Sequence, residues 1–167
     1  MVGLALEQEN QPKVHNHPPL EEVLAYHNQD IIDGFLKSLD VTEEEANNIF
    51  KDTLKWLWYC RHPDTQGSRT IDKNLLIIDE MWHTFILYTN DYFKFCHKYF
   101  GMYIHHSPTR NSEIEEYKKL TPEERTAEKR RQLELVYDVL GKETFISWYH
   151  LYPQKYTYSS ILELRKK

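Results

Sequence analysis

The residues best suited to chemistry in this chain are an aspartate and a group of histidines between positions 79 and 106. Asp79 and His83 are spaced as i and i+4, so on a helix their side chains share one face. His105 and His106 follow in an Ile-His-His-Ser-Pro segment. Carboxylate and imidazole groups bind divalent metals, and such nitrogen and oxygen donors suit zinc or iron. Asp79, His83, His105 and His106 are therefore candidate ligands of one divalent metal.

The same residues also fit an arrangement without a metal. In that alternative the Asp79 carboxylate hydrogen-bonds the His83 imidazole and fixes a helix. Adjacent histidines in an extended segment point to opposite sides, so we expect only one of His105 and His106 to join the others. Glu80 lies a quarter turn from Asp79 and is either a weak candidate for acid-base catalysis or a surface charge. We favour the surface charge for Glu80.

These groups can meet only if the chain turns back between them. A straight helix over residues 76–100 would place Phe100 roughly 25 Å from His83, at about 1.5 Å per residue. The five extended residues that follow span at most roughly 17 Å, which is too short to bring His105 back. A shared site therefore requires a break in the helix.

Such a break is predicted at Thr89-Asn90-Asp91. Threonine and asparagine are favoured at the N-cap of a helix, and aspartate suits the first turn. One helix should therefore end near Tyr88 and a second should begin near Asn90, with Gly101 ending the second. The segment is too apolar for an outer helix, so we predict a buried central helical hairpin.

Cys96 beside His97 suggests a nucleophile and its base, but neighbours on a helix diverge by about 100°. We interpret Cys96 as a small core residue. His97 falls on the Asp79 stripe of a straight helix, yet roughly 27 Å away, so it cannot share the site with Asp79.

Composition limits the class of protein. The 167 residues, 40% hydrophobic and 14% aromatic, fit a single folded domain. A net charge of -5 gives no broad positive field, so we expect no binding to nucleic acid. Cys60 and Cys96 form neither a disulfide framework nor a CxxC zinc motif, which favours reduced thiols and a cytoplasmic location. The only apolar run at the N-terminus is Val2 to Leu6, so we predict neither a secretory signal nor a membrane span.

Hydrophobic periodicity predicts helices throughout. Apolar residues recur at helical intervals over 20–39 and again from Thr42 to Trp58. Thr121-Pro122 starts a further helix that Gly141 stops, and residues 142–151 form a short last helix. No segment shows a strong period of two. The chain should therefore be all-α, a compact helical bundle around the central hairpin.

We divide the chain into three parts. Residues 1–18 form a flexible N-terminal arm, residues 19–153 a single helical domain and residues 154–167 a C-terminal tail. His15 and His17 of the arm are interpreted as solvated side chains rather than metal ligands.

The central segment also carries a distinctive series of residues: Asp79-Glu80-Met81-Trp82-His83, Ile86-Leu87, Thr89, Tyr92, Cys96, Phe100-Gly101 and Ile104-His105-His106-Ser107-Pro108. In order and spacing this series resembles the signature of the glycine-rich domain-containing protein-like family, a largely uncharacterised group of bacteria and eukaryotes. The resemblance covers roughly residues 70–108. It implies a similar hairpin and site but names no reaction or substrate.

The chain departs from that family in two respects. It lacks the glycine-rich tail of the plant members, and it has Phe85 where many relatives carry a second histidine, so a three-histidine site at that position cannot form. Eukaryotic relatives often have Ser-Pro where this chain has Thr89-Asn90, which supports the predicted helix break.

Two functions stay open from the sequence. In the first, Asp79, His83 and the His105-His106 segment form a polar or divalent-metal pocket, with or without catalysis. In the second, these residues are structural, and the chain is a non-enzymatic protein-interaction or regulatory module. Its protein partner would then dock on an exposed aromatic face or on the helix at 121–140.

Overall fold

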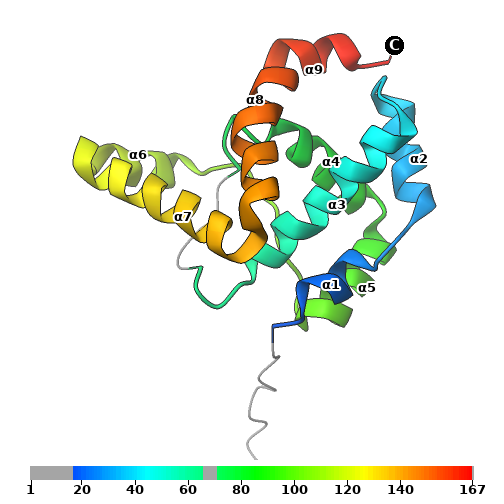
Figure 1. Cartoon of the computed structure of the whole chain (residues 1–167), viewed down its shortest axis with the longest axis horizontal. Helices are drawn as coiled ribbons and strands as arrows, with labels where there is room; N and C mark the ends of the chain where they lie inside the picture. Colours follow the sequence, from blue (N-terminus) through cyan, green and yellow to red (C-terminus); the bar gives the residue numbers. More distant parts are fainter. Residues whose placement is uncertain (1–16, 66–70, 167) are drawn as a thin grey trace, which may run out of the picture.

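The fold is all-α, as predicted. The computed structural model describes residues 17–65 and 71–166, and within these ranges it contains helices and no strand (Figure 1). In chain order the elements are α1 (Leu20–Leu24), α2 (Gln29–Ser38), α3 (Glu43–Cys60), α4 (Leu76–Leu87), α5 (Thr89–Phe100), α6 (Asn111–Lys119), α7 (Pro122–Ile146), the π-helical turn η1 (Ser147–Leu151), α8 (Tyr152–Lys155) and α9 (Tyr158–Leu164).

Helix α3 crosses the middle of the molecule and packs against α1, α2, α4 and α7 (Figure 1). It starts at a capping box: the Thr42 hydroxyl accepts a hydrogen bond from the Glu45 amide at 3.1 Å, and the Glu45 carboxylate accepts one from the Thr42 amide at 3.0 Å. Large side chains such as Trp56 and Leu57 are fully buried along it. Burial of this kind supplies most of the stability of a helical domain.

The central hairpin predicted from the sequence is confirmed. Helix α4 ends at Leu87, Tyr88 has non-helical angles (φ −82°, ψ 63°), and α5 begins at Thr89. No side chain caps α5, so the turn forms at the predicted place but without the capping bond that Thr89 or Asn90 was expected to supply. Gly101 ends α5 with a positive φ of 69°, a conformation that glycine adopts without a steric cost.

The N-terminal part differs from prediction in two ways. The single helix expected over 20–39 is two helices, because the Asn28 side chain accepts a hydrogen bond from the Asp30 amide and starts α2 anew. His17 is not fully solvated: its ring lies 4.5 Å from that of Trp58, whose indole N–H donates to the Pro18 carbonyl at 2.7 Å. His15 lies outside the described residues.

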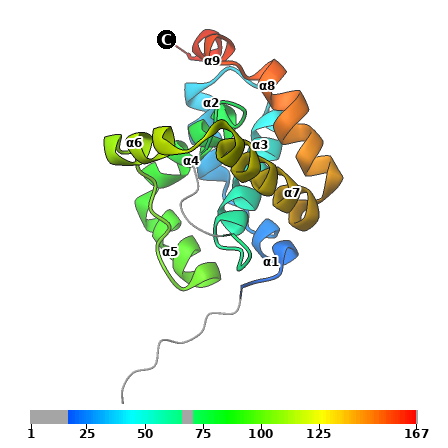
Figure 2. The same cartoon turned by 90° about the vertical axis from the view of Figure 1, so that its left-hand side faces the viewer.

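The C-terminal half holds helices that the sequence analysis missed. Helices α6 and α9 were not predicted, and residues 142–151 do not form the last helix. Gly141 interrupts the helix at the predicted place: its non-helical angles, φ 83° and ψ 167°, put a kink between the two helical stretches that make up α7. Helix α6 and the first part of α7, here called the α6–α7 arm, project from the body of the molecule (Figures 1 and 2).

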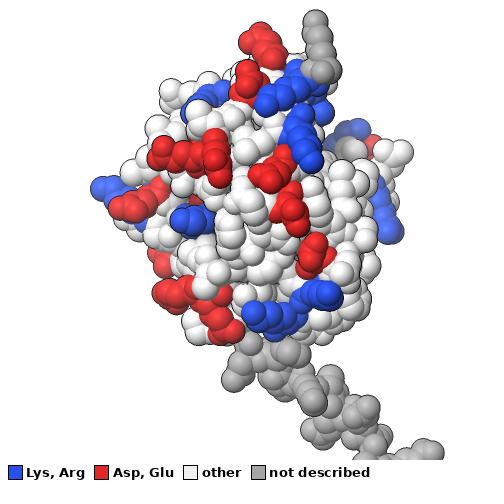
Figure 3. Space-filling model, turned by 90° about the vertical axis from the view of Figure 1, so that its right-hand side faces the viewer, with Lys and Arg blue, Asp and Glu red and all other residues white. Residues whose placement is uncertain are grey.

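The end of the described chain packs against the end of α2. Arg165 pairs with Leu39 in an isolated antiparallel bridge, and the Lys166 amide donates to the Ser38 carbonyl at 2.9 Å. The face seen in Figure 3 mixes acidic and basic side chains. Among the described residues, no helix has the length and apolar character needed to cross a membrane.

Candidate metal centre

Asp79, His83 and His106 come together at one point. The His106 Nε2 atom lies 2.9 Å from His83 Nε2 and 3.1 Å from Asp79 Oδ1. A second contact joins His83 Nδ1 to Asp79 Oδ2 at 3.7 Å. Each residue offers one ligand atom, and these atoms all lie within 4.8 Å of one another. We refer to these three residues as the Asp-His-His cluster.

The cluster is half open to solvent. The His83 side chain is 56% exposed, whereas those of Asp79 and His106 are 26% and 18% exposed. The apolar face of α4 is buried, with Ile78 and Met81 fully inaccessible, so the opposite face of this helix lies at the surface. Asp79 and His83 therefore stand on the rim of the core, where water or a ligand can reach them.

Tyr92 on α5 connects the two chain segments that build the cluster. Its hydroxyl accepts a hydrogen bond from the Trp82 indole N–H at 2.9 Å and donates one to the Ile104 carbonyl at 2.7 Å. Trp82 in turn stacks on the His106 ring, with centroids 4.2 Å apart and planes 13° from parallel. The side chain next to His83 therefore orients the imidazole that comes from the other segment.

The other predicted residues lie elsewhere. His105 is exposed and packs edge-on against Tyr103 at 4.9 Å, so it is not part of the cluster. Glu80 accepts a hydrogen bond from the Arg165 guanidinium at 2.7 Å, which ties α4 to the C-terminal end. Of the two adjacent histidines, only His106 reaches Asp79, in line with the expectation that one would.

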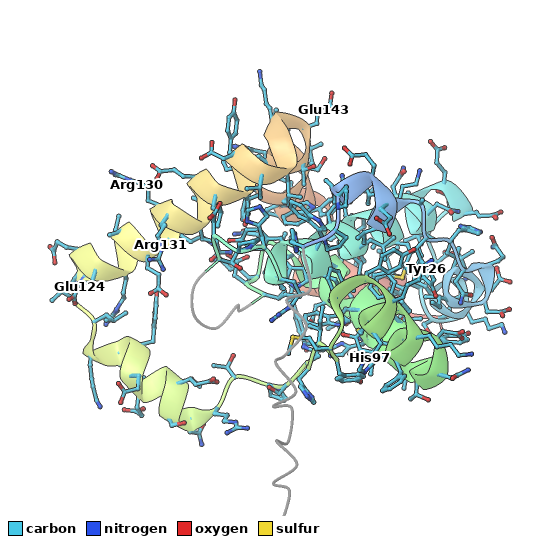
Figure 4. The ribbon with its side chains drawn as sticks, turned by 90° about the horizontal axis from the view of Figure 1, so that it is seen from below. Tyr26, His97, Glu124, Arg130, Arg131 and Glu143 are labelled. Atoms are coloured by element: carbon cyan, nitrogen blue, oxygen red, sulfur yellow. The ribbon has the colours of Figure 1, made fainter. Side chains whose placement is uncertain are left out.

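Cys96 and His97 take the positions that helix geometry predicted. Cys96 is buried, and this burial raises the pKa of its thiol. His97 is exposed on α5, where Figure 4 labels it, and it packs against Phe93 with ring centroids 4.1 Å apart. Neither residue supplies a nucleophile to the site.

A cleft of about 500 Å³ adjoins the cluster. Asp79, Trp82 and His106 form one side of it, and Cys60 and Arg61 at the end of α3 form part of the wall. The sequence analysis missed Arg61 and the positioning role of Tyr92. Arg61 gives no local signal, since only the packing of α3 beside α4 brings it here, and Tyr92 resembles any other core aromatic residue in sequence.

The separations within the cluster suit a divalent metal. Nitrogen and oxygen ligands bind zinc at about 2.1 Å, so two ligands of a tetrahedral zinc are about 3.4 Å apart. The two His106 contacts, 2.9 Å and 3.1 Å, are somewhat shorter than that separation. The three donor atoms are therefore close enough together to be candidate ligands of one metal ion.

The fold and the cluster together define an all-helical domain with an Asp-His-His group beside an open cleft. The model of the UCP032817-like family matches residues 26–121, more than half of the chain, and includes the whole cluster. This chain belongs to the UCP032817-like family. Neither a curated protein nor a solved structure matches it.

Proposed function

We propose that this chain binds one divalent metal through Asp79, His83 and His106 and presents the remaining coordination positions to the adjoining cleft. The main support is the convergence of three ligand atoms. Two Nε2 atoms 2.9 Å apart need a hydrogen between them, and His106 Nε2 has at most one hydrogen for both His83 and Asp79. A metal satisfies all three ligands at once.

The donor set limits the metal and its chemistry. Two imidazoles and one carboxylate suit zinc, and the same set with open positions is also used by non-haem iron. Bound there, the metal would supply Lewis acidity to a ligand in the cleft. His105 and Glu80 are left out of the ligand set, because His105 packs on Tyr103 and Glu80 pairs with Arg165.

The experiment is a metal titration of the chelator-treated full chain by calorimetry, with Zn²⁺ and, under anaerobic conditions, Fe²⁺. We expect one equivalent to bind, and His106→Ala to weaken binding by more than about 100-fold, since loss of a supporting partner alone costs 10–100-fold. His105→Ala is the matched control and should bind like the wild type. Equal loss in both variants, or no binding by the wild type, would refute the proposal.

A different observation favours the second candidate, a protein-interaction module. Helix α6 has no buried residue, and α7 buries only Val136 and Thr144 in its 25 residues. Tyr117 and Tyr137 are 51% and 47% exposed on the two helices. Figure 4 shows Glu124, Arg130 and Arg131 along this arm, away from the body.

The two candidates differ in what His83→Ala does. A metal site predicts that the variant loses bound metal and the stability that the metal adds. If the chain is an interaction module, the wild-type protein should contain no metal, and His83→Ala should leave its thermal unfolding unchanged. Melting curves of both proteins, with and without zinc, separate the two.

A further inference from the structure

The cleft beside the Asp-His-His cluster has an unequal distribution of charge. Arg61 lines it and makes no ion pair with any residue of the described ranges. Glu113, which also lines the cleft, accepts a hydrogen bond from the Arg110 amide at 2.7 Å, so its carboxylate is engaged at the start of α6. Once a divalent metal neutralises Asp79, positive charge exceeds negative charge along the cleft.

The cleft has apolar as well as polar lining residues. Ile71, Met102, Tyr103 and Ile104 contribute hydrocarbon or aromatic surface, and Trp82 closes the side next to His106. Pockets with apolar walls and a few polar groups bind small organic molecules, and the polar groups fix the orientation. About 500 Å³ is enough for a ligand with a single ring or a short chain.

The hydroxyl groups of Ser107 and Thr109 add neutral donors on the segment that follows His106. A guanidinium offers paired N–H donors whose geometry matches the oxygens of a carboxylate or a phosphate. The cleft therefore combines a metal position, a cation without a partner and an apolar wall.

We propose that this cleft binds a small organic oxyanion, a carboxylate or a phosphate ester, with Arg61 as the residue that selects the anionic group. One oxygen of the anion takes an open position on the metal, Arg61 holds another, and the body of the ligand lies along the apolar wall. This inference rests on the proposed metal site. It adds the class of ligand, which the metal ligands alone do not specify.

The test uses the full chain loaded with Co²⁺, whose visible absorption reports changes in coordination. Benzoate and phenyl phosphate serve as probes with the same ring and different oxyanions, and benzamide is the neutral control. We expect an oxyanion to bind and to change the cobalt spectrum, and benzamide to bind more weakly. Whichever of benzoate and phenyl phosphate binds more tightly shows whether the cleft prefers a carboxylate or a phosphate ester.

Substitution of Arg61 isolates its contribution. We expect Arg61→Ala to weaken oxyanion binding roughly tenfold to hundredfold, the range for a lost hydrogen bond to a charged group, while Co²⁺ affinity stays as in the wild type. The affinity of Arg61→Lys for the oxyanion should lie between those of the wild type and Arg61→Ala, because lysine keeps the charge but lacks the paired donors of the guanidinium. Arg110→Ala, which changes an arginine outside the cleft lining, is the control and should bind normally.

Two results would overturn the inference, and they have different meanings. If cobalt binds but benzamide binds as tightly as the oxyanions, or Arg61→Ala has no effect, the ligand class is wrong and the metal site stands. If the cobalt titration shows no binding, the proposed metal site itself has failed, and the inference fails with it.

Discussion

At the scale of single residues, the Tyr92 hydroxyl helps to position the site. It accepts from Trp82 on α4 and donates to the Ile104 carbonyl, so one buried oxygen joins the two segments that carry the cluster. Burial raises the pKa of this phenol well above its usual value, so the proton stays on the oxygen and the donated bond is kept.

Tyr92→Phe should therefore damage both stability and metal binding. It leaves the Trp82 N–H and the Ile104 carbonyl buried without their partner, at a cost of about 2–3 kcal/mol in the free energy of unfolding. Denaturant unfolding and zinc titration measure the two effects. Tyr99→Phe, at a buried tyrosine of the same helix without such a hydrogen-bond pair, is the control. Equal stability of the two variants would count against the role assigned to Tyr92.

His17 should make the N-terminal contact with Trp58 sensitive to pH. Burial, with the nearby His62 and Arg61 adding to it, lowers the pKa of His17 to about 4 from its usual 6.5. Between these values the unfolded or undocked chain binds more protons, so the docked state becomes less stable as the pH falls from 6.5 toward 4.

Tryptophan fluorescence follows this contact, since Trp58 is one of the four tryptophans of the chain. We expect a change between pH 6.5 and 4 in the wild type that His17→Gln removes. A transition of the same size and midpoint in the variant would assign it to another group.

Sequence predicted part of the cluster at this scale. The spacing of Asp79 and His83 placed them on one face, and the structure places them there. Which of His105 and His106 joins them depends on Trp82, which stacks on His106 alone. The selection of His106 therefore depends on packing between α4 and the segment after α5, which cannot be read from a local sequence pattern.

At the scale of elements, the sequence pattern predicted where the helix between α4 and α5 breaks, but not which contacts make the break. The turn before Asn90 was predicted from capping residues, yet the structure makes it through the backbone of Tyr88 without a side-chain cap. Helix α6 was missed because it is polar on nearly every side, so it has no apolar stripe to detect. The break before α2 was missed because the apolar residues on both sides kept a helical spacing.

Gly141 supplies a prediction about the bend in α7. Its angles, φ 83° and ψ 167°, lie in a region that is essentially restricted to glycine. A Cβ added there meets no atom of the described chain within 4 Å, so any cost comes from the backbone and not from a clash. Gly141→Ala should lower the free energy of unfolding by about 1–3 kcal/mol.

Denaturant unfolding of Gly141→Ala beside Lys142→Ala, the exposed neighbour, measures this strain. A variant as stable as the wild type would show that the bend does not require glycine at this position.

At the scale of the whole molecule, the C-terminal helices close onto α3. Glu45 pairs with Lys155 and also accepts a hydrogen bond from the Tyr156 hydroxyl at 3.2 Å. About two helical turns further along α3, Asp52 accepts a hydrogen bond from the Tyr152 hydroxyl at 2.6 Å. These contacts join parts of the chain that lie far apart in sequence, so periodicity could not predict them.

A fall in pH should weaken the contacts between the C-terminal helices and α3. The hydrogen bond from Lys155, followed by that from the Thr42 amide, lowers the pKa of Glu45 to about 2. The unfolded chain then binds more protons between pH 4.5 and 2, so stability is lost as the pH falls through this window. Unfolding curves of Glu45→Gln should depend less on pH there than those of the wild type. Glu44→Gln, in the same first turn, is the control and should keep the wild-type dependence.

The central claim is that the α4–α5 hairpin brings together, as metal ligands, Asp79 and His83 on α4 and His106 on the segment after α5. X-ray absorption of the zinc-loaded full chain tests it most directly. The account predicts nitrogen and oxygen ligands at about 2.0–2.1 Å, with scattering from two imidazole rings. A sulfur ligand at about 2.3 Å, which would point to Cys60 on the cleft wall, or a shell with fewer than two imidazoles, would contradict it.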